Sequence, residues 1–149
     1  MPGDMNLQLN KCPQKLVGFL RKKGFIEDYY FDKQFFGNEI YKFKTDHILI
    51  RILSDRSIWS IEISSCYIDP NDFYDFPLVM LMIENISLDD IVVIDVQEEY
   101  FINKFNEIYS NFDNIHYKET IEKLRFFQSE RMKRRLGIVK EGNIYKHIV

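Results

Sequence analysis

The sequence predicts an α+β fold, and two kinds of pattern support this prediction. Residues 36–65 contain three runs in which apolar and polar side chains alternate, as they do in half-buried strands. Residues 12–23, 98–112 and 117–136 instead repeat apolar side chains every three or four positions, which is the period of a helix. We therefore expect an N-terminal helix, an antiparallel meander of four strands, and three C-terminal helices packed on one face of that sheet.

The first helix is predicted at residues 12–23, and an outer strand follows it at residues 25–31. Asn10 is a candidate N-cap, and Pro13 fits the first turn because its missing N–H needs no partner there. Gly24 favours the end of the helix, since glycine readily adopts the left-handed conformation found after helices. The apolar stripe of this helix consists of Leu16, Val17, Phe19 and Leu20.

The three remaining strands are predicted between residues 39 and 65. We place two-residue turns at 45–46 and 55–56 and count outwards, which pairs Ile52 with Trp59. One face of the sheet is then wholly apolar, and a slip by one residue would turn that face outward. The predicted core positions on this face are Ile48, Ile50, Ile52, Trp59, Ile61 and Ile63.

The three C-terminal helices are predicted at residues 77–84, 98–112 and 117–136. Asp75 is a candidate cap for the first of them, and residues 91–96 fit either a strand or the start of a buried helix. The expected inward positions are Phe101, Phe105, Ile108, Tyr109, Phe112, Ile121, Leu124, Phe127 (or Phe126) and Met132.

The length and composition favour a single domain over residues 1–149. With 46% hydrophobic residues the chain can bury a core without disulfides or metal. Residues 1–9 and 138–149 are expected to be flexible, or the latter an edge strand. The two cysteines share no short motif, so we expect a reduced, cytoplasmic chain rather than a disulfide. No run approaches the ~20 apolar residues of a membrane span, and we expect no membrane partner.

The charge of the chain is unevenly distributed, although the net charge is only −3. Residues 57–114 carry 12 acidic side chains against one base, Lys104, whereas the segments on both sides have an excess of bases. Two interpretations remain open. The acidic segment could steer a basic partner towards the protein, or the basic C-terminal helix could fold back on it and neutralise it.

Catalytic and metal-binding motifs are not found. The three histidines are scattered singly, and six glycines leave little room for phosphate-binding loops. Asp69, Asp72 and Asp75 lie in one loop as calcium ligands do, but the central glycine and terminal glutamate of an EF-hand are missing. The acids between 89 and 99 could converge as catalytic carboxylates, although helical spacing leaves most of them in solvent. We therefore expect no enzyme activity, no metal and no cofactor.

A basic cluster near the end of the last helix consists of Arg131, Lys133, Arg134 and Arg135. Nucleic-acid-binding proteins usually present a whole basic face with stacking aromatic side chains. The sequence pI of this chain is about 5.6, and bases at a helix C-terminus favourably oppose the helix dipole. We therefore expect no specific nucleic-acid binding by this cluster.

Three sequence features belong together: residues 36–38 (Phe-Gly-Asn), residues 50–64 with Asp55-Arg56 at their centre, and residues 74–75 (Tyr-Asp). Together they resemble the small immunity proteins of bacterial polymorphic toxin and contact-dependent growth inhibition systems. Ser57 stands where the related pattern usually has glycine. The resemblance implies a protein that binds and neutralises a cognate toxin domain, often a nuclease, and performs no catalysis.

Combining the resemblance with the charge pattern, we expect the acidic segment to bind a basic toxin domain. The alternative, from another class, is a regulatory or nucleic-acid-associated binding module that uses the basic cluster. The candidate partner-binding residues are Asp69, Asp72, Asp75, Asp89, Asp90, Glu98 and Glu99, with Tyr67 and Tyr74 as aromatic anchors.

Overall fold

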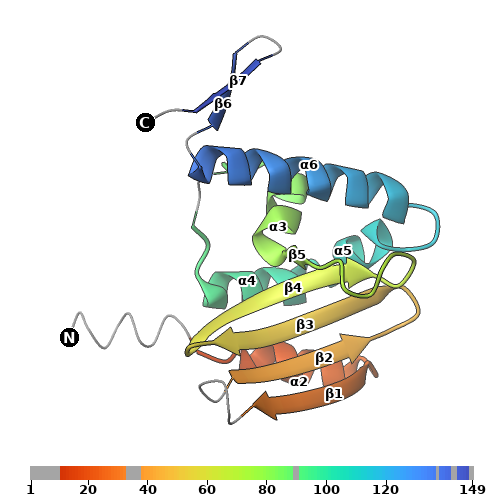
Figure 1. The fold of residues 1–149 in the computed structure, drawn as a ribbon. Helices are drawn as coiled ribbons and strands as arrows, with labels where there is room; N and C mark the ends of the chain where they lie inside the picture. The colour runs from red at the N-terminus through yellow and green to blue at the C-terminus, as the bar shows by residue number, and fades with distance from the viewer. Residues whose placement is uncertain (1–10, 33–37, 89–90, 137, 142–143, 148–149) are drawn as a thin grey trace.

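The computed structural model describes residues 11–32, 38–88, 91–136, 138–141 and 144–147. Over these residues the fold is α+β, with a five-stranded antiparallel sheet in the order β1-β2-β3-β4-β5 (Figure 1). The strands are β1 (Ile26–Asp32), β2 (Asn38–Lys44), β3 (Ile48–Asp55), β4 (Ile58–Ser65) and β5 (Tyr74–Asp75). The sheet has one strand more than predicted, because the two residues of β5 pair with β4 inside a segment whose Asp, Asn and Pro content predicts a loop.

The register of the central strands differs from the predicted register by two residues. Ile52 lies opposite Ile61 rather than Trp59, because the turn is formed by Arg56 and Ser57. The pairing of β2 with β3 is shifted by the same amount. A shift of two residues leaves every side chain on its predicted face. The face prediction is therefore confirmed: Ile48, Ile50, Ile52, Ile61 and Ile63 are buried in the core, and Trp59 packs against it while partly exposed.

The turn between β3 and β4 places two non-glycine residues in the left-handed region. The φ angle is 53° at Arg56 and 69° at Ser57, as in the type I′ hairpin turn. The side chain of Asn38 helps to hold this turn, since its Oδ1 accepts a hydrogen bond from the Arg56 N–H at 3.1 Å. Ser57 is the position at which the immunity-like pattern has glycine, and glycine has no steric penalty at this φ angle.

Replacing Ser57 by glycine should therefore stabilise the protein. The left-handed conformation costs an L-residue roughly 1–2 kcal/mol, and about half of that gain is lost to the larger backbone entropy of glycine when unfolded. We expect the free energy of unfolding in urea to rise by about 0.5–1 kcal/mol with an unchanged m-value. Ser60→Gly in β4 is the matched control and should destabilise; a loss of stability in Ser57→Gly would contradict this reading of the turn.

Five helices lie in the described residues: α2 (Gln14–Lys22), α3 (Phe76–Glu84), α4 (Ile94–Asn103), α5 (Phe105–Asn111) and α6 (Tyr117–Arg135). The helix predicted at 98–112 is thus two helices, because the backbone leaves the helical conformation at Lys104, where φ is −108° and ψ is 19°. The ambiguous residues 91–96 are also settled, since 91–93 have no regular structure and the helix begins at Ile94. The candidate cap Asn10 lies outside the described residues.

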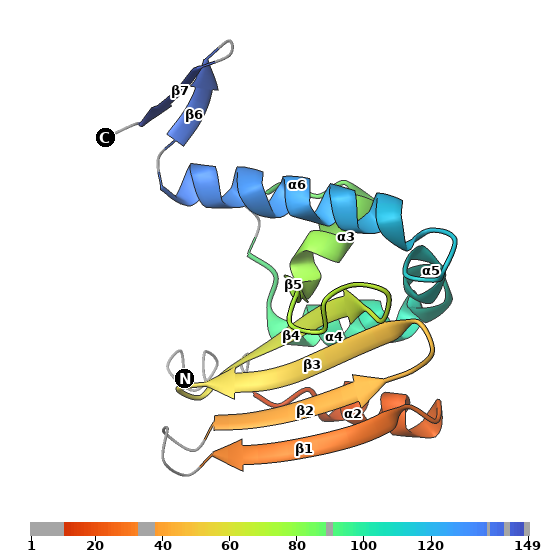
Figure 2. The ribbon, with the colours of Figure 1, turned by 45° about the vertical axis from the view of Figure 1, so that its right-hand side comes forward.

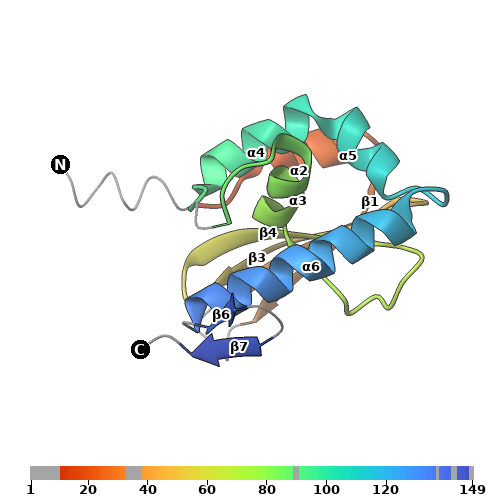
Figure 3. The same cartoon turned by 90° about the horizontal axis from the view of Figure 1, so that it is seen from above.

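The helices do not form the single layer that was predicted. Figure 3 shows α2, α4 and α5 on one side of the sheet, whereas α6 lies across the β4–β5 end of the sheet beside α3. Figure 2 shows α6 beyond the β4–β5 end of the sheet, with β1 at the opposite end of the sheet. Aromatic rings join the helices to one another: Phe101 packs on Phe76 with ring centroids 5.2 Å apart, and Phe105 packs on Phe19 at 5.3 Å.

Helix α6 buries side chains only in its first half. Ile121 and Leu124 are buried as predicted, and Phe127 is partly buried. Met132 is 59% exposed, so its predicted inward position is wrong. Beyond α6, β6 (Ile138–Glu141) and β7 (Ile144–His147) form a separate two-stranded sheet that projects from the end of the helix (Figures 1 and 2). None of the described helices is both long and apolar enough to cross a membrane.

Candidate functional site

Two of the three loop aspartates that were predicted to contact a partner form ion pairs with arginines of α6. Asp72 Oδ2 accepts a hydrogen bond from Arg125 Nη2 at 2.9 Å, and Asp75 Oδ2 accepts one from Arg131 Nη2 at 2.7 Å. Asp69 stays exposed and accepts the Asn71 N–H in a local turn. The Asp72 and Asp75 side chains keep 36% and 40% of their surface exposed, so their contact with a partner stays a prediction. The alternative, a C-terminal helix that folds back and neutralises acids, is confirmed for these two.

The two predicted aromatic anchors, Tyr67 and Tyr74, differ in solvent exposure. Tyr74 is only 1% exposed, and its hydroxyl is held by Arg125 Nε at 2.9 Å, so its predicted role as an exposed anchor is wrong. It is buried because it belongs to β5, the strand that the sequence did not predict. Tyr67 is 39% exposed, and its ring lies beside those of His47 and Tyr117. Tyr67 therefore remains available at the surface.

Glu98 has a structural role within the fold, and its predicted contact with a partner stays a prediction. It is 8% exposed, and its Oε2 accepts the backbone N–H of Leu16 at 2.9 Å, across 82 residues of sequence. Helix α2 needs this acceptor because Pro13, at its N-cap, provides no side-chain hydrogen bond. A carboxylate is well suited to the first turn of a helix, where the exposed N–H groups carry partial positive charge. Glu98 thereby ties α2 to α4.

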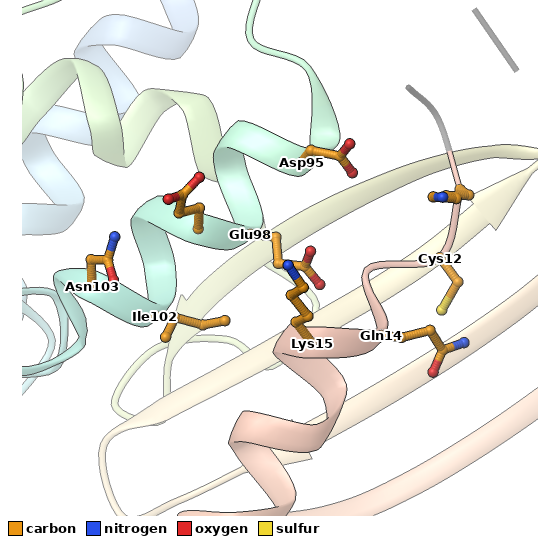
Figure 4. Close-up of a pocket in the computed structure, with 9 residues that line it drawn as sticks. Cys12, Gln14, Lys15, Asp95, Glu98, Ile102 and Asn103 are labelled. Carbon is orange, nitrogen blue, oxygen red and sulfur yellow. The ribbon is translucent and has the colours of Figure 1, made fainter. Parts of the chain in front are cut away.

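A groove lined mainly by polar residues lies between the start of α2 and α4 (Figure 4). Its volume is about 650 Å³. Asp95 and Glu99, one helical turn apart on α4, are exposed and line one wall. Lys11 and Lys15 line the other wall, and Glu98 lies between the two. The full lining consists of Lys11, Cys12, Gln14, Lys15, Asp95, Glu98, Glu99, Ile102 and Asn103.

The opposite charges of the two walls do not neutralise one another directly. Within the part of the chain that the structure describes, no ion pair shorter than 4.0 Å joins Lys11 or Lys15 to Asp95 or Glu99. A second hollow of about 300 Å³ shares Ile102 and Asn103 with the groove and extends it along α5. The groove therefore offers charged groups of both signs to a molecule that docks along it.

The sequence pointed to only part of this groove. Glu98 and Glu99 were predicted contacts and both line it, whereas Asp95 belonged only to the wider group of acids between 89 and 99. The lysines were not predicted as contacts at all. Lys11 precedes α2, which begins at Gln14, so helical spacing gives no signal that would group it with Lys15. Asp89 and Asp90, which were also predicted contacts, lie outside the described residues.

Cys12 lines the groove, and its thiol has a raised pKa. Partial burial, together with the nearby carboxylates of Glu39 and Glu98, raises the pKa of its thiol to about 11. The thiolate is the nucleophilic form of cysteine, so its population near neutral pH is small. The groove therefore lacks the activated thiol that nucleophilic catalysis by Cys12 would require.

The raised pKa predicts slow alkylation of Cys12. At pH 8 the thiolate fraction should be about 0.1%, against roughly a quarter for an ordinary cysteine, so iodoacetamide should react on the order of 100-fold more slowly than with a free thiol. Mass spectrometry of the protein in a Cys66→Ser background, sampled from pH 7 to 11, measures the rate at this single site. A rate that levels off near pH 8.5 would show that the groove does not perturb Cys12.

The basic cluster of α6 is partly engaged within the fold. Arg131 pairs with Asp75, and Lys133 pairs with Glu130 at 3.5 Å. Arg134 and Arg135 are exposed at the end of the helix. These contacts offer no support for a nucleic-acid interface, and the expectation of no specific nucleic-acid binding stays a prediction.

No group of three or more His, Cys, Asp or Glu side chains in the described residues is arranged to hold a metal ion. The candidate calcium ligands have different partners: Asp69 accepts the Asn71 N–H, Asp72 pairs with Arg125, and Asp75 pairs with Arg131. Comparisons with protein-family models, with curated proteins and with solved structures found no match to this chain. The immunity-protein resemblance therefore rests on the sequence features at residues 36–38, 50–64 and 74–75.

Proposed function

We propose that this chain is a non-enzymatic, immunity-like protein that binds and neutralises a cognate toxin domain of a bacterial polymorphic toxin or contact-dependent growth inhibition system. The toxin domain is basic, as many nucleases are, and docks along the groove between α2 and α4. The protein acts in the cytoplasm, by covering the toxin rather than by modifying it.

The observation that carries this proposal is the exposed acidic wall of the groove. Three of the acids in residues 57–114 have partners within the molecule: Asp72 and Asp75 pair with arginines, and Glu98 caps α2. Asp95 and Glu99 remain exposed next to a hollow. Exposed acids at a concave site raise the rate at which a basic partner associates and fix its orientation.

The lysines on the opposite wall favour a protein partner over a simple cation. A small cation would be repelled by Lys11 and Lys15, which line the same hollow as the two acids. A protein surface can instead place a base against Asp95 and Glu99 and an acid against the lysines. Matching both signs also discriminates between related partners, because a misplaced like charge is costly.

The experiment is co-expression of this chain with the product of the neighbouring gene in a bacterial host. Survival with this chain, but not with an immunity protein of unrelated sequence, is the expected result. Purified chain should also bind that product with a micromolar or tighter Kd. A harmless neighbour, or a neighbour that the chain does not bind at micromolar concentration, would overturn the proposal.

A further inference from the structure

The face of the sheet that points away from the core carries a hollow of about 340 Å³. Side chains alternate between the two faces of a strand, so Lys42 and Lys44 of β2 lie on the opposite face from the buried Phe43. The other walls come from β1, from β3 and from residues 70–73 of the loop before β5. Helices α2, α4 and α5 lie on the other side of the sheet (Figure 3). We call this site the outer hollow.

The wall formed by Phe73 is held in place by contacts within the molecule. The Arg51 guanidinium lies over the Phe73 ring, with 4.3 Å between Cζ and the ring centroid, and its Nε donates a hydrogen bond to Glu62 Oε1 at 2.7 Å. The residue before Phe73 is fixed as well, because the buried Ser64 hydroxyl donates to the carbonyl oxygen of Asp72 at 2.7 Å. These contacts pre-form the outer hollow, as is usual for sites that bind small molecules.

Apolar side chains provide much of the lining. Ile26 of β1 and Leu49 of β3 lie on either side of Lys44, each directly across from it in the sheet, and Phe73 lies on the loop side. Ile26 is 72% exposed, and Leu49 and Phe73 are partly exposed. Small-molecule sites are typically hollows of roughly 300–1,000 Å³ with a mainly apolar lining and a few polar groups. The outer hollow fits this description at the low end of the range.

The charged groups of the outer hollow are mainly basic. Lys42, Lys44 and Arg51 line it, against one acid, Asp28. Arg51 is paired with Glu62, whereas no acid of the described residues forms an ion pair with either lysine within 4.0 Å. The two lysines are two positions apart on β2, so their side chains leave the same face about 7 Å from each other. Both ammonium groups can therefore reach one anion.

We propose that the outer hollow binds a small organic anion, in which one carboxylate, sulfonate or phosphate group is joined to an apolar body. The anionic group contacts Lys42 and Lys44, and the apolar body lies on Leu49 and against Phe73. Burial of the apolar body supplies most of the affinity, and the lysines fix its orientation. This proposal does not depend on the proposed function, because the groove between α2 and α4 lies on the other side of the sheet.

The acids on the neighbouring strands favour a small anion over a nucleic acid. Asp28 of β1 lies directly across from Lys42, and Glu62 of β4 lies directly across from Arg51. The basic region is therefore narrow, with an acid on each side of it along this row of the sheet. A nucleic acid carries a negative charge at every phosphate and would meet these carboxylates. A ligand with one anionic group occupies only the basic part.

Two dyes that differ in one charged group test this proposal. Anilinonaphthalene sulfonate has an apolar ring system and one sulfonate, and phenylnaphthylamine has the same rings without the sulfonate. Fluorescence titration of the full chain with the sulfonate dye at low ionic strength should give a saturable Kd of about 10–100 μM. Lys42→Gln combined with Lys44→Gln should raise this Kd about 2- to 30-fold, because two exposed charge contacts are lost. The Kd of the uncharged dye should stay the same.

The matched control combines Lys22→Gln with Lys118→Gln, which removes the same charge from two exposed lysines outside the outer hollow. We expect it to leave the Kd of both dyes unchanged. The uncharged dye also serves as a check on the fold, because it binds the double variant of Lys42 and Lys44 normally only if the hollow is still formed.

Amide chemical shifts locate the bound dye. The amides of Leu49 and Phe73 should shift more on addition of the sulfonate dye than the amide of Leu16, which is buried in α2 on the other side of the sheet. Three results would overturn the proposal: no saturable binding up to about 1 mM, an equal change in Kd for the two dyes or for the two double variants, or the largest shifts outside the outer hollow.

Discussion

Replacing Phe101 by alanine should lower the free energy of unfolding by about 3–5 kcal/mol, because it truncates one of the largest side chains in the core. Phe101 is fully buried in α4, and its ring packs on those of Phe76 and Phe105 with centroids 5.2 and 6.0 Å apart. Truncation removes both the burial of the ring and the ring–ring contacts, and it leaves a cavity where α4, α3 and α5 meet.

The control for Phe101 is Phe126→Ala on α6, where the ring is 60% exposed. Its truncation should change stability by less than about 0.5 kcal/mol, because little apolar surface leaves the core. Urea unfolding followed by Trp59 fluorescence measures both variants. Equal losses in the two variants would contradict the placement of the core between the helices and the sheet.

Removing the carboxylate of Glu98 should also destabilise the protein, by about 1–3 kcal/mol. Glu98→Ala leaves the Leu16 N–H buried at the start of α2 without its acceptor at 2.9 Å. Glu98→Gln keeps an oxygen that can accept this hydrogen bond and should cost less. Glu99→Ala, at the next position but exposed, is the matched control and should change stability little.

Hydrogen exchange locates the effect of Glu98 on the chain. If the carboxylate caps α2, Glu98→Ala should speed the exchange of amides in the first turn of α2 more than that of amides in β3. Uniform exchange across the molecule, or equal losses of stability for Glu98→Ala and Glu99→Ala, would show that Glu98 does not have this role.

The faces of the sheet could be predicted from the sequence, but the register could not. A burial pattern with a period of two residues is unchanged by a shift of two, so it placed Ile50 and Ile61 on the core face in either register. The turn decided the register, and it contains neither Asn-Gly nor Asp-Gly. Its left-handed residues, Arg56 and Ser57, are residue types that give no signal for this conformation.

The elements that the sequence missed depend on contacts between distant segments. β5 is two residues long, too short for a pattern of its own, and exists because Tyr74 and Asp75 pair with β4. The break at Lys104 also gave no signal, since no glycine or proline lies near it. Tertiary packing rather than local preference determines such features.

The sequence predicted the candidate site only in part, because here too the deciding contacts join segments that are distant in the sequence. Counting acids located the acidic segment, but counting could not tell which of them the fold uses. Arg125 and Arg131 come from α6, more than 50 residues away from the aspartates they bind, and the partner of Glu98 is 82 residues away. Only the structure separates these acids from Asp95 and Glu99, which remain exposed on the groove.

The association rate with the toxin domain tests the central claim, that the acidic wall of the groove meets a basic partner. Asp95→Asn combined with Glu99→Gln should slow association by about 3- to 10-fold at low ionic strength and flatten its salt dependence, with a smaller change in dissociation. The matched control combines Asp69→Asn with Glu122→Gln, which removes two exposed acids outside the groove. We predict an association rate close to that of the wild type for this control; equal slowing of both variants, or no slowing of the groove variant, would contradict the claim.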